Sequence, residues 1–144
     1  MKILLLNGVN MNMLGRRNPD CYGKDTLGVL EKKVASYAKE KGIKTVTAHS
    51  NYEGRLVEIL QQTKCDAVIF NAGAYSHYSY ALRDCIECIG VPVIEVHMSD
   101  IYSREDFRKT DVLKDVCAGY FYGKGIESYF EAVDFAVNSV MDKK

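Results

Sequence analysis

The sequence of 144 residues has no tryptophan and only two prolines, and its nineteen basic residues are balanced by nineteen acidic ones. Without an excess of positive charge or a run of Lys and Arg, neither nucleic-acid binding nor a polybasic membrane attachment is expected. The opening apolar run, residues 3–6, is too short for a signal peptide or a membrane span. We therefore expect a cytoplasmic protein with no nucleic-acid or membrane partner.

The five cysteines are an odd number and lack the paired spacing of a zinc ribbon, so reduced thiols are expected and no metal site is predicted. Cys85 and Cys88 form a Cys-x-x-Cys pattern. That pattern lies inside a stretch of helical periodicity and not at a strand-to-helix turn, which does not favour a redox site.

Short apolar segments alternate with stretches of helical periodicity, which predicts an α/β fold. Strands are expected at 2–6, 45–48, 67–71, 91–96 and 116–122, and helices at 26–41, 52–63, 78–89, 103–108 and 126–143. Strands that are apolar on both faces and joined by helices imply a parallel sheet covered on each side. We predict one domain over residues 1–144, a flavodoxin-like three-layer sandwich with a five-stranded parallel sheet.

Polar residues follow four of the expected strands, and all three histidines of the chain lie among them. The third strand, for example, ends in Asn71, and Gly73 and His77 follow it. Ligands of open parallel sheets bind beyond the carboxyl ends of the strands. A binding site is therefore predicted at this edge, with glycine allowing close backbone approach and helix capping as the alternative role of the polar residues.

The segment 10–23 follows the first strand and is rich in Gly, Pro, Asn and Asp, which is typical of a lid or binding loop. It places Arg17 five residues before Tyr22. A phenol normally loses its proton near pH ~10, and an arginine within about 4–6 Å lowers that pKa by about 1–3 units. Tyr22 is thus a candidate base, with a packing tyrosine and a solvated arginine as the alternatives.

A candidate acid lies at the end of the fourth expected strand. His97 follows Glu95 by two residues, so both side chains share one face and Glu95 is placed to orient the imidazole. Such a histidine can release a proton to a leaving oxygen within hydrogen-bond reach. A structural histidine in the core is the alternative.

An anion site is predicted directly after this strand. Free N–H groups at Met98 and Ser99, at a strand-to-helix turn, favour a carboxylate. Arg104 and Arg108 are four residues apart in an expected helix and would share one face, with surface charge as the alternative. Together these features predict a small, anionic, hydroxyl-bearing ligand.

The chain resembles the type II 3-dehydroquinate dehydratases in several blocks that occur in order. One block is Leu-Asn-Gly-Val-Asn-Met-Asn-Met-Leu-Gly-Arg-Arg-Asn-Pro, starting at Leu6, and another is Asn-Ala-Gly-Ala-Tyr-Ser-His, starting at Asn71. The remaining blocks are residues 22–23, 50–54, 81–84 and 95–108. The blocks span nearly the whole chain, which makes the resemblance far more specific than any single motif.

The resemblance implies that Tyr22 removes a proton α to the ketone of 3-dehydroquinate, while Arg17 holds it as phenolate. His97 would protonate the departing hydroxyl, and Asn10 would stabilise the enolate oxygen. The expected result is anti elimination to 3-dehydroshikimate in the shikimate pathway, or the same step in quinate breakdown. Substrate binding would fall to Asn71, His77, Asp84, Met98, Ser99 and Arg108.

The resemblance also implies a dodecamer built from trimers, with Asp84 reaching in from a neighbouring subunit, and no metal or organic cofactor. Asp100 stands where the family usually has asparagine, so it either repels the ligand carboxylate or caps a helix. The alternative function is a non-catalytic flavodoxin-like module, such as an FMN carrier or a receiver domain. A receiver requires acidic strand exits, whereas those of the first and third strands carry Asn7 and Asn71.

Overall fold

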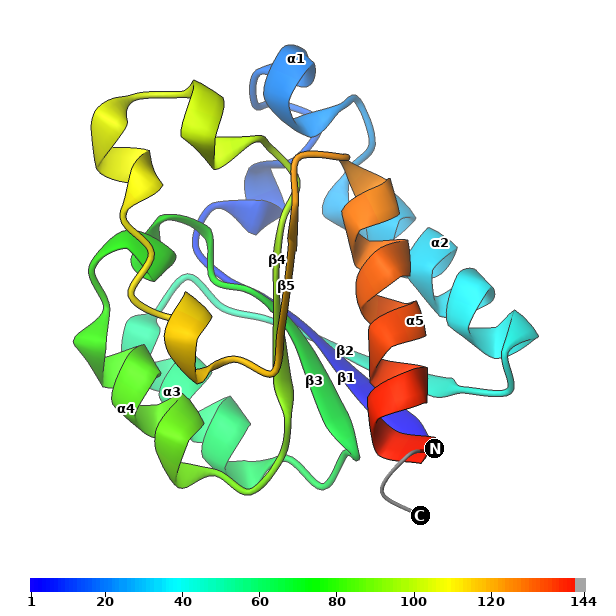
Figure 1. The fold of residues 1–144 in the computed structure, drawn as a ribbon. Coiled ribbons are helices and arrows are strands. Elements are labelled where there is room, and N and C mark those ends of the chain that lie inside the picture. Colours follow the sequence, from blue (N-terminus) through cyan, green and yellow to red (C-terminus); the bar gives the residue numbers. More distant parts are fainter. Residues whose placement is uncertain (142–144) are drawn as a thin grey trace.

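The computed structural model describes residues 1–141. Within them the chain forms a parallel sheet of five strands in the order β2-β1-β3-β4-β5 (Figure 1). The strand order reverses between β1 and β3, as in flavodoxin-like folds. The predicted fold class is confirmed. The strands are β1 (Lys2–Asn7), β2 (Lys44–His49), β3 (Ala67–Asn71), β4 (Val93–His97) and β5 (Gly119–Tyr122).

Helices cover both faces of the sheet, with α2 and α5 on one face and α3 and α4 on the other (Figure 1). Each face has its own buried apolar core, and β1, β3 and β4 contribute residues to both cores. No helix among residues 1–141 is both long and apolar enough to cross a membrane. The helices are α1 (Pro19–Tyr22), α2 (Leu27–Glu40), α3 (Glu53–Gln62), α4 (Tyr80–Cys88) and α5 (Ile126–Met141), with 3-10 turns η1 (Met11–Met13), η2 (Gly73–His77), η3 (Ile101–Ser103), η4 (Asp106–Lys109) and η5 (Lys114–Val116).

Local sequence signals explain where the longer helices begin and end. The Thr26 hydroxyl accepts the Val29 N–H at 3.3 Å at the start of α2, and Ser79 caps α4 in the same way. Helix α2 is followed by Gly42 at φ +77°, a backbone region that glycine adopts without strain. The helix expected to end at residue 41 therefore ends, at Glu40, just before a residue suited to that end.

The expected helix at 103–108 is wrong. Two separate turns, η3 and η4, replace it, and Arg104 between them is extended at φ −106° and ψ −160°. The Asp100 carboxylate accepts the Tyr102 N–H at 3.1 Å and caps η3. The extended residue then directs the chain back over the carboxyl edge of the sheet, which a continuous helix would not do.

Two expected strands begin too early in the sequence. Strand β4 begins at Val93 because Pro92 has no N–H to donate, although its carbonyl accepts the Val68 N–H at 3.0 Å. Strand β5 begins at Gly119. Before it, Val116 and Cys117 pack against the core that α3 and α4 cover, and Ala118 donates one hydrogen bond to the Val93 carbonyl oxygen at 2.8 Å. The expected end of the last helix at residue 143 lies outside the described residues.

The exits of β1 and β3 pack against each other through two glycines. A Cβ on Gly8 would lie 2.6 Å from the Ala72 carbonyl oxygen, and one on Gly73 would lie 2.7 Å from that of Val9. Gly73 also has φ +65°. The close backbone approach expected at Gly73 is thus made to a neighbouring loop of the chain, and Gly73 also lines the site described next.

Candidate active site

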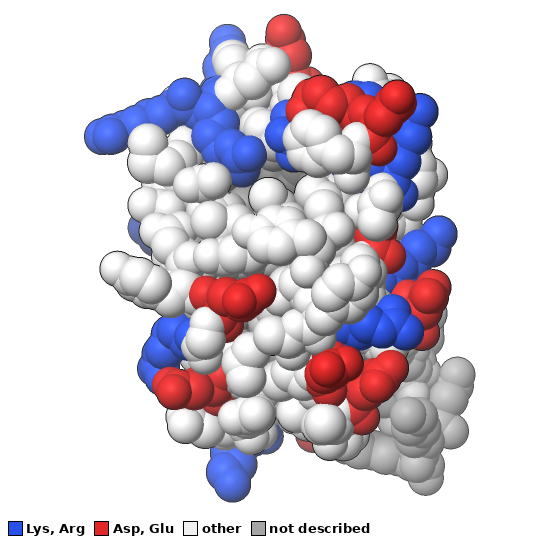
Figure 2. Space-filling view, turned by 90° about the vertical axis from the view of Figure 1, so that its left-hand side faces the viewer, with Lys and Arg blue, Asp and Glu red and all other residues white. Residues whose placement is uncertain are grey.

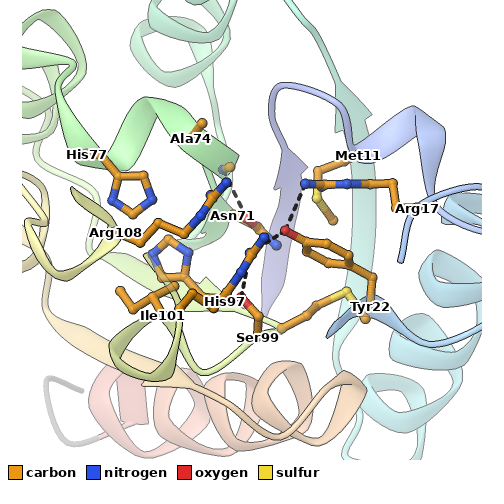
Figure 3. A pocket seen from close by; sticks show the side chains of 13 residues that line it. Met11, Arg17, Tyr22, Asn71, Ala74, His77, His97, Ser99, Ile101 and Arg108 are labelled. Carbon is orange, nitrogen blue, oxygen red and sulfur yellow. Dashed lines mark hydrogen bonds between the residues drawn. The ribbon is translucent and has the colours of Figure 1, made fainter. Parts of the chain in front are cut away.

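A pocket lies at the carboxyl edge of the sheet, beside the point where the strand order reverses, as predicted. Figure 2 shows a hollow near the top of one face, with basic side chains beside it and a largely uncharged surface below. The space inside the pocket is only about 30 Å³. That leaves room for only a few water molecules between the side chains shown in Figure 3. The lining residues are Met11, Arg17, Tyr22, Asn71, Gly73, Ala74, His77, His97, Met98, Ser99, Ile101, Arg104 and Arg108.

Tyr22 lies on one wall of the pocket, and two guanidinium groups donate hydrogen bonds to its phenol oxygen. Arg17 Nη2 lies 2.8 Å from that oxygen and Arg104 Nη1 lies 2.6 Å from it (Figure 3). The Arg17 guanidinium carbon also sits 3.7 Å from the centre of the phenol ring. Two charged donors on one oxygen stabilise a negative charge there.

The segment that carries Tyr22 forms a short capped helix, α1, and not an irregular loop. The Asn18 side chain accepts the Asp20 N–H at 3.0 Å, and Pro19 occupies the first position of α1. Gly15 at φ +92° and Gly23 at φ +71° flank this turn. Tyr22 is consequently held at the end of a short helix and is only 9% exposed.

Arg104 is a residue whose place in the site the sequence did not reveal. The sequence suggested it only as a partner of Arg108 on a helix face, and the helix is absent. From its extended position Arg104 reaches both Tyr22 and the Ser99 hydroxyl, the latter at 3.3 Å. Burial, and after it the positive charges of Arg104 and Arg108, lower the pKa of Arg17, while the Tyr22 oxygen acts in the opposite direction.

His97 lies on the opposite wall and is 5% exposed. Its Nε2 atom is 2.6 Å from Oε2 of Glu95, whose side chain is fully buried on the same face of β4, as the spacing predicted. Asp111 was not predicted, and its Oδ2 lies 3.4 Å from the same nitrogen. Burial alone would lower the pKa of His97, but its interactions with Asp111 and Glu95 outweigh burial and raise that pKa to about 9.

Among the described residues, Glu95, His97 and Asp111 also lie close enough together to be compared with a cation site. Their ligand atoms lie within 4.8 Å of one another. Two ligands of a tetrahedral zinc ion, each about 2.0–2.2 Å from the metal, are about 3.3 Å apart. The 2.6 Å between His97 and Glu95 is shorter and matches a charge-assisted hydrogen bond, so the cluster is arranged to hold protons.

His77 lies next to His97, with 6.4 Å between the ring centres. Its Nδ1 donates a hydrogen bond to the Thr110 carbonyl oxygen at 2.7 Å, which leaves Nε2 as an acceptor in the neutral ring. Burial lowers the pKa of His77, and the positive charges of His97 and Arg108 act in the same direction. His77 is therefore neutral beside a charged His97.

Met98 and Ser99, where the sequence predicts an anion site, line the pocket. Within residues 1–141, neither the Met98 N–H nor the Ser99 N–H donates to another protein group. Arg108 lines the same pocket, and its Nε donates to Glu105 Oε2 at 2.8 Å. Asp100 turns its carboxylate toward the backbone of η3, so it acts as the cap and not as a charge facing this site.

Asn71 is 4% exposed, and its side chain already has protein partners. Its oxygen accepts the Gly73 N–H at 3.0 Å and its nitrogen donates to the Tyr129 hydroxyl at 2.9 Å. Two predicted residues lie outside the pocket lining. Asn10 is exposed at φ +67° with its N–H bonded to the Asn51 side chain at 2.9 Å, and Asp84 is exposed on α4.

A flavodoxin-like fold whose switch point holds a phenol between guanidinium groups, and an imidazole against two acidic side chains, is typical of a small enzyme that uses acid–base chemistry. The comparisons narrow this class. The family model "Dehydroquinase class II" matches residues 1–137. The chain is 49% identical over 135 residues to a 3-dehydroquinate dehydratase of Pelotomaculum thermopropionicum, covering 92% of this chain and 94% of that protein.

Solved structures agree with this result. The type II dehydroquinase of Butyrivibrio crossotus superposes with a TM-score of 0.92 at 38% identity, covering 95% of this chain and 97% of that one. The type II dehydroquinase of Propionibacterium acnes gives a TM-score of 0.90 at 34% identity, covering 94% and 96%. The chain therefore belongs to the class II dehydroquinase family.

Proposed function

We propose that this chain dehydrates 3-dehydroquinate to 3-dehydroshikimate, the shikimate-pathway step, by general base and general acid catalysis. The observation that carries the proposal is the phenol oxygen of Tyr22, which receives two guanidinium hydrogen bonds within the pocket that also contains His97. A tyrosine that only packs has no need of two charged donors on one oxygen. A tyrosine that must act as a phenolate does.

In the proposed reaction, Tyr22 as phenolate removes the proton from the carbon next to the ketone. Arg17 and Arg104 keep the phenol oxygen negative before that step, and the negative charge then passes to the ketone oxygen of an enolate. Asn10, at the start of the 10–23 segment, contacts the enolate oxygen through a bound water once this segment closes over the substrate.

The enolate then expels the hydroxyl group, and His97 donates the proton that makes it water. The raised pKa of His97 supports this role, because it leaves the imidazole charged near neutral pH. Base and acid lie on opposite walls of the pocket. That placement suits an anti elimination, in which the proton and the hydroxyl leave from opposite faces of the ring.

In this proposal the substrate carboxylate binds the free N–H groups of Met98 and Ser99, and the positive charge of Arg108 balances it. Arg108, His77 and Asn71 contact the ring hydroxyls. The pocket of about 30 Å³ is too small for a six-membered ring. Entry therefore requires the 10–23 segment to move outward with Tyr22. Its flanking glycines, Gly15 and Gly23, are the positions where the backbone can turn.

The direct test is the rise in ultraviolet absorbance of the conjugated enone when purified protein meets 3-dehydroquinate. Turnover that survives dialysis against a chelator supports the proposal. Absence of any signal at high protein concentration, with ligand binding retained, would leave a family member that binds without reacting. A colourless preparation would argue against the alternative of an FMN carrier.

We further propose that residues 1–144 act as one catalytic domain within a dodecamer of trimers, where Asp84 completes the pocket of a neighbouring subunit. Its exposed position on α4 supports this placement. Asp84→Asn should lower kcat/KM without changing the assembly measured by light scattering. A monomer with full activity would contradict the proposal. A cytoplasmic location stays a prediction.

A further inference from the structure

Asp111 is a buried acid that the proposed reaction does not use. Its side chain is 3% exposed, and it lies between η4 and η5. One carboxylate oxygen, Oδ1, accepts the N–H groups of Leu113 at 2.9 Å and Lys114 at 3.1 Å. The second, Oδ2, faces His97 Nε2 at 3.4 Å and has no hydrogen-bond partner among residues 1–141. The turn thus fixes this carboxylate against the imidazole.

Glu95 presents the same arrangement from the other side. Its Oε2 holds His97 Nε2 at 2.6 Å, while its Oε1 is buried and has no partner within the described chain. Two ionised carboxylates with unpaired oxygens, both out of water, would be costly. A proton on one carboxyl turns an unpaired acceptor into a donor toward the other and removes the like-charge repulsion.

We propose that Asp111 is a positioning residue for His97, and that with Glu95 it forms a buried proton-holding cluster that keeps the imidazole charged. The proposal rests on the proposed function, in which His97 is the acid. In this cluster Asp111 is the permanent carboxylate, because two backbone N–H groups fix its other oxygen. Glu95 carries the additional proton and orients the ring.

The charge states agree with this geometry. Although burial alone would raise it, the pKa of Asp111 is lowered to about 2 by His97, Glu95 and the Leu113 N–H. Burial raises the pKa of Glu95 to about 8, and the pKa of His97 is raised to about 9. Near neutral pH the cluster therefore holds one carboxylate, one neutral carboxyl and one imidazolium, with no net charge.

Other groups around His97 do not supply a competing negative charge. His77 is neutral, and burial raises the pKa values of Tyr120, whose ring centre lies 6.0 Å from that of His97, and of Cys117. The remaining charged groups of the pocket are the guanidinium groups, which act against a charged imidazole. The groups that face the cluster from its neighbouring elements are thus His77 from η2, Arg108 from η4, Cys117 after η5 and Tyr120 from β5.

The test is a proton NMR titration of the His97 ring in the wild type and in Asp111→Asn, with the His97 signal assigned from His97→Gln. Asparagine retains the oxygen that accepts the turn N–H groups but removes the charge. We expect the His97 titration to move down by about 1 pH unit or more, and the alkaline limb of kcat to move with it. Asp115→Asn, which removes an exposed acid four residues on, should leave both unchanged. An unmoved His97 titration in folded Asp111→Asn would overturn the proposal.

A second measurement decides the matter if Asp111→Asn does not fold. In the wild type, isotope-edited infrared spectra at neutral pH should show a protonated carboxyl whose band disappears near pH 8, before His97 loses its proton. A His97 that titrates near its ordinary value of ~6.5, without such a carboxyl, would overturn the proposal. Neither titration depends on turnover, so an inactive protein whose His97 responds to Asp111→Asn would contradict the reaction and not the cluster.

Discussion

Removal of either arginine that donates to Tyr22 gives a sharp test of the base. Each contact is a charge-assisted hydrogen bond, at 2.8 Å from Arg17 and 2.6 Å from Arg104. Such bonds contribute about 1.5–3 kcal/mol, and each ~1.36 kcal/mol is tenfold in rate. Arg17→Ala and Arg104→Ala should each lower kcat/KM for 3-dehydroquinate by about 10- to 150-fold, measured from the enone absorbance.

The double variant extends this test. Because both guanidinium groups act on one oxygen, their effects should not add, and the combined loss should differ from the product of the single losses. Arg16→Ala is the matched control, since Arg16 is exposed in the same segment. If Arg104→Ala remained within about twofold of wild type, the short contact to Tyr22 would have no part in transition-state stabilisation and the reasoning would fail.

Three further outcomes are expected. Tyr22→Phe should abolish turnover while ligand affinity by calorimetry stays close to wild type, and a nearly normal rate would eliminate Tyr22 as the base. Arg108→Ala should weaken ligand binding strongly, whereas unchanged affinity would place that arginine outside the site. Because the folded pKa of His97 is raised from 6.5 to about 9, its stabilisation is complete below pH 6.5 and is lost as the pH rises to about 9. The free energy of unfolding measured with urea should therefore fall across that pH window, and it should fall less in His97→Gln than in the wild type. Equal pH dependence in the two proteins would contradict a charged imidazole.

Much of the fold could be predicted from local sequence patterns, such as apolar runs and helix caps. Residues 67–70, for example, are continuously apolar, which is typical of a strand in a parallel sheet covered on both faces. Helix starts at Thr26 and Ser79 follow from caps. The wrong expectations at 103–108 and 116–117 concern short stretches, where periodicity alone does not separate a helix, a strand and a turn.

In the site, too, contacts between residues close in sequence could be predicted, and contacts between distant residues could not. Arg17 and Tyr22 are five residues apart and Glu95 and His97 two, so their contacts follow from local geometry. Arg104 reaches Tyr22 across 82 positions, a contact that depends on the extended backbone between η3 and η4. Nothing in the local sequence indicates that path. Likewise Asp111 looks like a turn residue, and only the packing of β4 turns its second oxygen toward His97.

The proposed mechanism requires one pocket to hold a base and an acid that are both in their reactive forms. A phenolate and an imidazolium are each the less stable form of their group in water near neutral pH. Here Arg17 and Arg104 donate hydrogen bonds to the Tyr22 oxygen, while Glu95 and Asp111 lie against His97. In the proposed mechanism each of these groups favours the charge on its own side of the pocket. Substitutions on one wall should consequently shift one limb of the pH profile and leave the other in place. Were Asp111→Asn to shift the acidic limb alone, this separation of the two walls would be wrong.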